Sequence, residues 1–137
     1  MTLELQATPE EVMRAVETLR DFGHSNRVPE KALFGLMLAL EESASNIVNH
    51  ALRRDPNQKF LVLIEHAGSA VTLELRDRGP RFDPTQAVVA PRIEPDDRPA
   101  GAWGVQLVRR FIDEIRYARE ADENVLRLTK RLNEAPG

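Results

Sequence analysis

Three short stretches of this sequence combine polar side chains and glycines that could bind a ligand or carry out chemistry. They are Glu42 with Asn46, Asp77 with Gly79, and Gly101 with Gly104. A carboxylate and an amide one helical turn apart can orient a hydroxyl or a water and can supply an oxygen ligand to magnesium. Glycines at the start of a helix leave backbone N–H groups open to phosphate. The residue types therefore suit a nucleotide site, if the fold brings the stretches together.

The longest helical pattern of the chain begins at Pro29 and ends near Leu52. Apolar residues recur along it at the spacing of one helix face, which we expect to pack on a sheet. This apolar stripe consists of Leu33, Leu36, Met37, Leu40, Ala44, Ile47, Val48 and Ala51. Residues 32–40 are apolar on every side, so the opposite side of the helix should also be covered there.

Glu42, Asn46 and Asn49 fall opposite the apolar stripe and close to one another at about 100° per residue. One interpretation is a solvated polar face, which is common for acids and amides on a helix. The other is that the polar patch begins where the cover of the preceding turns ends, so that Glu42 and Asn46 line a cavity. The helix pattern alone leaves both interpretations open.

Asp77 ends a pattern typical of a strand. Val71, Leu73 and Leu75 alternate with other residues, and the same period places Asp77 on the inward side. A buried carboxylate needs a donor such as a backbone N–H, an arginine or an amino group of a ligand. The alternative is that Asp77 serves the turn that follows it. Gly79, two residues later, would let a flat ring approach the backbone closely.

The segment 79–101 contains five prolines, so it can form neither a helix nor a central strand of useful length. Loops of this length commonly act as lids or binding loops. Gly101 and Gly104 follow it at the mouth of a helix that we expect to run from Gly104 to about Asp113. A helix N-terminus is a natural phosphate site, although the two glycines could equally form a hinge and Trp103 could serve packing alone.

The remaining patterns complete an α+β fold. Strands are expected at 2–6, 59–66, 71–77, 114–119 and 125–131, and the helices at 9–22, 29–52 and 104–113. The first helix is preceded by Thr8 as its N-cap and begins with Pro9. This order predicts a two-layer α/β sandwich, with helices on one face of a mixed, mostly antiparallel sheet. We expect residues 1–137 to form a single domain.

Composition excludes several classes of protein. Apolar residues make up 42% and charged residues 30% of the chain, as in globular proteins, and the net charge of −3 argues against direct nucleic-acid binding. The absence of cysteine excludes disulfides and thiolate metal sites and suits a reducing compartment. We find no signal-peptide pattern and no stretch of about 20 apolar residues. A cytoplasmic protein that does not contact the membrane is therefore expected.

Taken in order, the three stretches resemble the N, G1 and G2 boxes of the GHKL ATPase superfamily, which has the Bergerat ATP-binding fold. Residues 38–51 contain E-x-x-x-N as in the N box, 75–84 contain D-x-G-x-x-F-D-P as in the G1 box, and 101–108 resemble the G2 box. The likeness continues through 111–117 and 124–128 and so covers nearly the whole chain. It is strongest to the anti-sigma-factor serine/threonine-protein kinases.

The resemblance implies a role for each box. Glu42 would be the general base, Asn46 a magnesium ligand, and Asp77 the acceptor for the amino group of adenine. The family pattern implies further nucleotide contacts at Gly79, Phe82, Gly101, Trp103, Gly104 and Val105. ATP and Mg²⁺ are the cofactors that follow from this resemblance.

The same resemblance implies a kinase that moves the γ-phosphate of ATP to a serine or threonine of an anti-sigma-factor antagonist. In its other state such a protein sequesters a sigma factor, and dimerisation is also carried over from the family. The alternatives are a nucleotide-dependent binding module without kinase activity and an interaction domain that binds no nucleotide. A histidine kinase is disfavoured because none of His24, His50 and His66 lies in a separate dimerisation helix.

Overall fold

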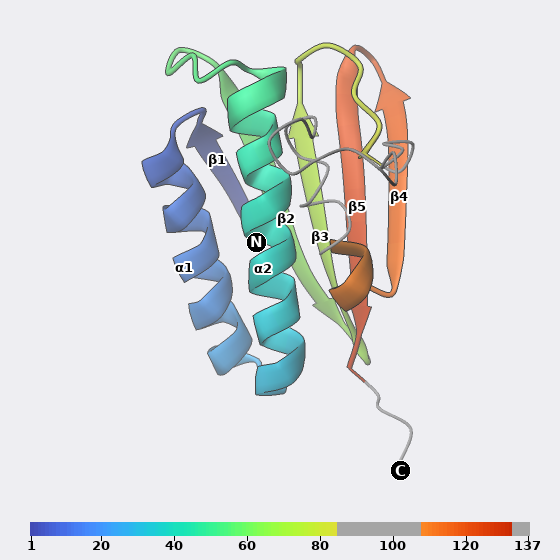
Figure 1. Cartoon of the computed structure of the whole chain (residues 1–137). Coiled ribbons are helices and arrows are strands. Elements are labelled where there is room, and N and C mark those ends of the chain that lie inside the picture. Colours follow the sequence, from blue (N-terminus) through green and yellow to red (C-terminus); the bar gives the residue numbers. More distant parts are fainter. Residues whose placement is uncertain (85–107, 133–137) are drawn as a thin grey trace, which may run out of the picture.

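The computed structural model describes residues 1–84 and 108–132, which form a five-stranded sheet with helices on one face (Figure 1). Its strands, in the spatial order β1-β2-β3-β5-β4, are β1 Thr2–Gln6, β2 Lys59–Ala67, β3 Ala70–Asp77, β4 Glu114–Glu120 and β5 Glu123–Arg131. The predicted α+β class and two-layer arrangement are confirmed. The sheet was predicted to be mixed and mostly antiparallel. In the described residues all four neighbouring strand pairs are antiparallel.

Helix α1 spans Pro9–Ser25 and begins as predicted. The Thr8 hydroxyl oxygen accepts a hydrogen bond from the Glu11 N–H at 3.3 Å, which satisfies one of the free N–H groups at the helix start. The helix runs three residues beyond the expected end at Phe22. It stops at Asn26, whose backbone N–H and side-chain amide both donate to the Phe22 carbonyl.

Helix α2 spans Glu30–Asn46 and continues directly into a π-helix, η1, at Ile47–Ala51. The predicted helix was a single α-helix over this range. In η1 the Leu52 N–H donates to the Ile47 carbonyl at 2.8 Å, five residues back, so the turn is wider than an α-turn. Side chains after Asn46 are consequently rotated away from the positions that an α-helix would give them.

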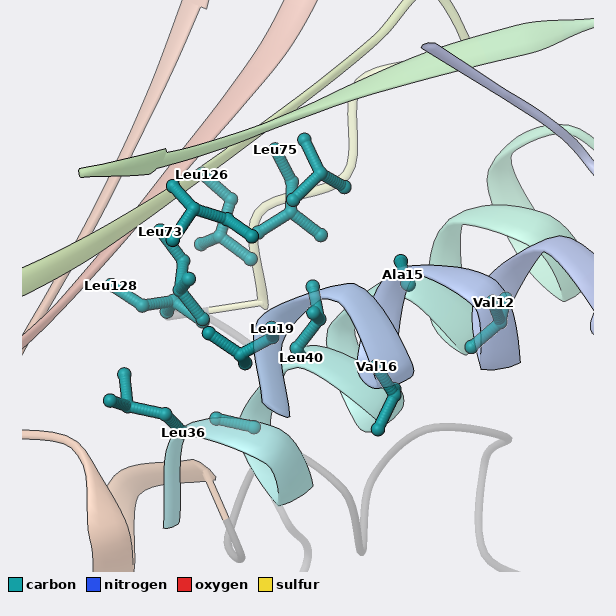
Figure 2. Packing of buried hydrophobic residues seen from close by; sticks show 14 of the residues in the cluster. Val12, Ala15, Val16, Leu19, Leu36, Leu40, Leu73, Leu75, Leu126 and Leu128 are labelled. Carbon is teal, nitrogen blue, oxygen red and sulfur yellow. The ribbon is translucent and has the colours of Figure 1, made fainter. Parts of the chain in front are cut away.

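The hydrophobic core lies between the helices and the sheet, as Figure 2 shows. The cluster includes Val12, Ala15, Val16 and Leu19 of α1, Leu36 and Leu40 of α2, and the strand residues Leu73, Leu75, Leu126 and Leu128. The predicted stripe of α2 is buried except at Met37 and Ala51, which are half-buried. Burial of alternate residues along β3 confirms the inward side predicted for that strand.

The other face of the sheet carries charged side chains that pair with one another. Glu74 lies 2.8 Å from Arg76 Nε through one carboxylate oxygen and 3.3 Å from Arg127 Nη2 through the other. The inward side chains of the strands are mainly apolar, whereas the outer face is more polar, so the inward face offers the larger apolar surface to the helices. This difference between the faces explains why both α1 and α2 lie on the same side (Figure 1).

The expected cover over the far side of α2 is only partial. Phe34 is 60% exposed, which contradicts complete cover of residues 32–40. Its ring packs edge-on against Phe111, with ring centroids 5.9 Å apart, in the helical residues 108–111. The expected start of that helix at Gly104 lies outside the described residues. In the described ranges, no helix has the length and apolarity needed to cross a bilayer.

Candidate functional site

A pocket that is partly open to solvent lies on the helix-covered face of the sheet. Apolar side chains of η1, β4 and β5 form much of its wall. The described polar and charged residues that line it are Ser43, Asn46, Asp77, Arg109, Tyr117 and Asn124. Mostly apolar walls with a few convergent polar groups are typical of a site for a small organic ligand.

Asp77 lies where the strand pattern predicted it, inward and only 4% exposed. Its Oδ1 accepts hydrogen bonds from the Gly79 N–H at 2.9 Å and from Asn124 Nδ2 at 3.0 Å. The bond to Gly79 shows that Asp77 does serve the following turn, but with one oxygen only. Within the described residues Oδ2 makes no hydrogen bond. Asp77 therefore lines the pocket with an acceptor available to a ligand.

Burial raises the pKa of the Asp77 carboxyl above its ordinary value, and the hydrogen bonds from Asn124 and Gly79 offset part of this rise. The charge of Arg119 lowers the same pKa further, whereas the charge of Glu123 raises it. A donor from a ligand would compensate the buried carboxylate, since hydrogen bonding to the charged form favours that form.

Asn124, at the start of β5, holds this corner of the pocket together and is only 4% exposed. Its Nδ2 donates to Asp77 and to the Pro80 carbonyl, at 3.0 and 2.9 Å. Its Oδ1 accepts from the Phe82 N–H at 3.2 Å and from the Tyr117 hydroxyl. With both ends of its amide occupied, Asn124 orients Asp77 and anchors the segment that follows it.

Asn124 and Tyr117 were not among the predicted site residues. The signal was present in the two-residue period of the last strands. Leu126 and Leu128 point inward, so the same period places Asn124 inward as well. Tyr117 lies two residues after Ile115, and both line the pocket.

The packing around Gly79 requires a glycine, and the predicted approach of a flat ring to its backbone stays a prediction. A Cβ at this position would lie 2.8 Å from both the Cβ and the carbonyl oxygen of Ala51 in η1. The Gly79 carbonyl in turn accepts a hydrogen bond from Arg119 Nη1 at 2.7 Å. Gly79 therefore packs closely against the π-helix η1, which leaves no room for a side chain at this position.

We expect Gly79→Ala to lower the free energy of unfolding by about 2 kcal/mol, because the added methyl overlaps the carbonyl oxygen and the Cβ of Ala51, which cannot move aside without moving the backbone. Urea unfolding measures this change. Gly68→Ala is the matched control, since Gly68 has a φ of +58° but no atom within 4 Å of the added Cβ. It should cost only about 1 kcal/mol from backbone strain. Equal losses in the two variants would argue against the close packing at Ala51.

The structure separates the three polar residues that were predicted to lie together on the long helix. Asn46 is half-buried, lines the pocket and has no hydrogen-bond partner in the described ranges. Glu42 is half-buried but is not among the described residues that line the pocket. Asn49 is exposed, and its Oδ1 accepts from Arg54 Nε at 2.7 Å. The wider turn of η1 explains why Asn49 leaves the patch.

Partial burial raises the pKa of Glu42 above its ordinary value, and the neighbouring charge of Glu41 raises it further. A carboxylate with a raised pKa is a better proton acceptor near neutral pH than an ordinary one. Of the two interpretations of the polar patch, the solvated face fits Asn49, which is exposed. It does not fit Asn46, which is half-buried and lines the pocket.

The other predicted contacts divide into two groups. Phe82 lines the pocket, and its N–H is held by Asn124. The G2-box residues Gly101, Trp103, Gly104 and Val105 lie outside the described residues. Their predicted role in holding phosphate stays a prediction.

A metal ion would find few protein ligands here. In residues 1–84 and 108–132, no three His, Cys, Asp or Glu side chains are grouped so that they could hold one. The amide oxygen of Asn46, in the pocket wall and without a described partner, is a suitable single ligand. Mg²⁺ commonly takes one or two protein ligands and completes its shell with phosphate oxygens and water, so this donor set fits magnesium bound together with a nucleotide.

The raised pKa of Asp77 predicts a pH dependence of stability. The folded state binds this proton more tightly than the unfolded chain, so the penalty for burying the charge is present at neutral pH. It is relieved as the pH falls through the folded pKa toward the ordinary value of 3.8. We therefore expect the free energy of unfolding of Asp77→Asn, relative to wild type, to decline between neutral pH and about pH 4. Urea titrations of both proteins test this, and a constant difference would contradict it.

The structure is thus a two-layer α+β sandwich with a buried acid in a pocket beside α2, an arrangement typical of small-molecule-binding domains. The chain belongs to the family of histidine kinase-like ATPase domains, whose model matches residues 5–130. This membership agrees with the resemblance of its three boxes to the GHKL superfamily.

Individual relatives support the same assignment. The chain is 31% identical over 129 residues to the serine/threonine-protein kinase BtrW of Bordetella bronchiseptica, covering 93% of this chain and 91% of that protein. The crystal structure of the RsbU and RsbW domains of Rv1364c from Mycobacterium tuberculosis has a TM-score of 0.66 at 18% identity. That match covers 96% of this chain but 31% of the other. The histidine kinase AdeS of Acinetobacter baumannii has a TM-score of 0.55 at 12% identity, covering 98% of this chain and 68% of AdeS. Both structural matches show similarity of fold.

Proposed function

We propose that residues 1–137 form one domain that binds Mg-ATP and transfers the γ-phosphate to a serine or threonine of an anti-sigma-factor antagonist. In its other state the same protein would bind a sigma factor. The observation that carries the proposal is Asp77, a buried carboxylate in the pocket wall, with one oxygen held and the other without a hydrogen bond in the described chain. The similarity to a relative named as a serine/threonine-protein kinase supports the choice of reaction.

Recognition of the base would depend on Asp77. Its Oδ2 is an acceptor that suits the exocyclic amino group of adenine, and the apolar wall around it suits a flat aromatic ring. Guanine has a carbonyl oxygen where adenine has that amino group. This oxygen and the Asp77 carboxylate are both acceptors, so they could not form a hydrogen bond. The pocket should therefore prefer ATP to GTP.

Asn46 would hold Mg²⁺ through its amide oxygen, and the amides near Gly101 and Gly104 would bind phosphate, as the family pattern implies. Magnesium bound in this way neutralises negative charge on the phosphates. Phosphoryl transfer depends mainly on positioning and electrostatics, so a few well-placed side chains are sufficient.

Glu42 would act as the general base. It lies one turn before Asn46 on α2, makes no hydrogen bond or ion pair within the described residues, and has a raised pKa. It would accept the proton of the attacking hydroxyl while the bond from the hydroxyl oxygen to the γ-phosphorus forms and ADP leaves. A sigma-factor partner would place this reaction in the cytoplasm.

Two measurements test the proposal. Calorimetry with Mg-ATP and Mg-GTP should show binding with a preference for ATP, and γ-labelled ATP should pass label to a partner protein that co-purifies with the chain. Co-purification with and without ATP would identify such partners. Binding without transfer of label to any of them would favour the nucleotide-dependent binding module. No binding of Mg-ATP would contradict the proposal as a whole.

A further inference from the structure

Ser43 is a buried side chain of α2 at a variable position of the E-x-x-x-N pattern, and no role was predicted for it. It is 5% exposed and lines the pocket, one residue after Glu42 and three before Asn46. Its hydroxyl makes no hydrogen bond within the described residues. A serine or threonine inside a helix usually donates to the carbonyl four residues back, as Thr18 does to Arg14 at 2.8 Å. Ser43 lacks this bond.

A buried hydroxyl without a partner is unfavourable, because it has lost its bonds to water without replacing them. An alanine at this position would pack at least as well against the apolar wall. The hydroxyl therefore needs a partner that enters the pocket, and this partner is either a ligand atom or water.

The apolar residues that line the pocket together with Ser43 indicate which part of a ligand it meets. Ile47 of η1 and Leu126 and Leu128 of β5 line the same pocket and are all buried. Apolar surroundings of this kind disfavour a charged phosphate and suit a neutral ring. A hydroxyl can both donate and accept, so it can match either a ring nitrogen or an amino group of a purine.

We propose that Ser43 is a further nucleotide-binding residue, whose hydroxyl hydrogen-bonds the adenine base directly or through one ordered water. This inference rests on the proposed binding of ATP and adds a base contact on the α2 wall to the one at Asp77 on β3. It predicts that the contact is independent of the number of phosphates.

The test is calorimetry of Ser43→Ala with Mg-ATP and with Mg-ADP. We expect affinity for both nucleotides to fall by about fivefold, as for the loss of one hydrogen bond. The ligand-free variant should unfold at the same or a higher urea concentration than wild type, because no hydrogen bond of the ligand-free protein is lost.

Ser45→Ala is the matched control. Ser45 lies on the same helix, is half-buried and is not among the described residues that line the pocket. It should bind both nucleotides as wild type does. Unchanged affinity of Ser43→Ala, an equal loss in Ser45→Ala, or a loss for ATP alone would overturn the inference.

The wild-type titration separates this inference from the proposed function. If wild type binds neither nucleotide, the proposed function fails and the contact at Ser43 fails with it. If wild type binds and Ser43→Ala binds equally well, only the inference about Ser43 fails.

Discussion

Replacing Glu42 by Gln should lower the rate of phosphotransfer by about a hundredfold or more, while the affinity for Mg-ATP changes little. General-base catalysis contributes about 10²–10⁴ to a rate, and glutamine keeps the size of the side chain but cannot accept the proton. Binding should persist because Glu42 is not among the described residues that line the pocket. Transfer of label from γ-labelled ATP to the partner protein, measured at saturating ATP, gives the rate.

Glu41→Gln is the control for this experiment. Glu41 is the adjacent residue on α2, is also half-buried, and loses the same charge on substitution. Its loss should change the rate only slightly, through the small effect of its charge on the pKa of Glu42. Equal rates for wild type and Glu42→Gln would show that Glu42 is not the base.

Replacing Asp77 by Asn should weaken Mg-ATP binding by about a hundredfold with the fold retained. A hydrogen bond to a charged group contributes about 1.5–3 kcal/mol, and an asparagine with its oxygen on Gly79 and Asn124 would present an NH₂ group to the amino group of adenine. The ligand-free protein should not lose stability from the loss of charge, because burial disfavours the charged form of Asp77.

Asp122→Asn is the matched control for Asp77→Asn. Asp122 is exposed in the turn between β4 and β5 with a φ of 66°, a conformation that asparagine tolerates well. The Asp122→Asn variant loses the same charge at a site away from the pocket, so it should bind Mg-ATP as wild type does. Calorimetry gives both affinities, and circular dichroism checks the fold. Full affinity in Asp77→Asn would contradict recognition of adenine by this residue.

The local patterns of the sequence predicted most of the fold, because the features concerned depend on near neighbours. Thr8 before Pro9 predicted the start of α1, since an N-cap needs only the next few N–H groups. The alternation of β3 placed Asp77 inward, because successive side chains of a strand point to opposite faces of the sheet.

Contacts between distant segments were harder to predict. Ala51 of the π-helix η1 packs against Gly79, which lies 28 residues later in the chain. This contact explains why a glycine is needed at position 79. The same change of helix type removed Asn49 from the polar patch. Phe34 stayed exposed because apolar character along a helix does not say which elements are available to cover it.

For the candidate site, the sequence by itself determined the residue types and the order of the three boxes, together with the inward direction of Asp77. Spacing within one helix or strand is sufficient for such features. The tertiary structure decided that Asn124 and Tyr117 orient this acid and that the Ser43 hydroxyl is buried without a partner in the described chain. Those properties depend on how α2, β3, β4 and β5 pack around one pocket, because burial and the completion of hydrogen bonds are set by segments that are distant in sequence.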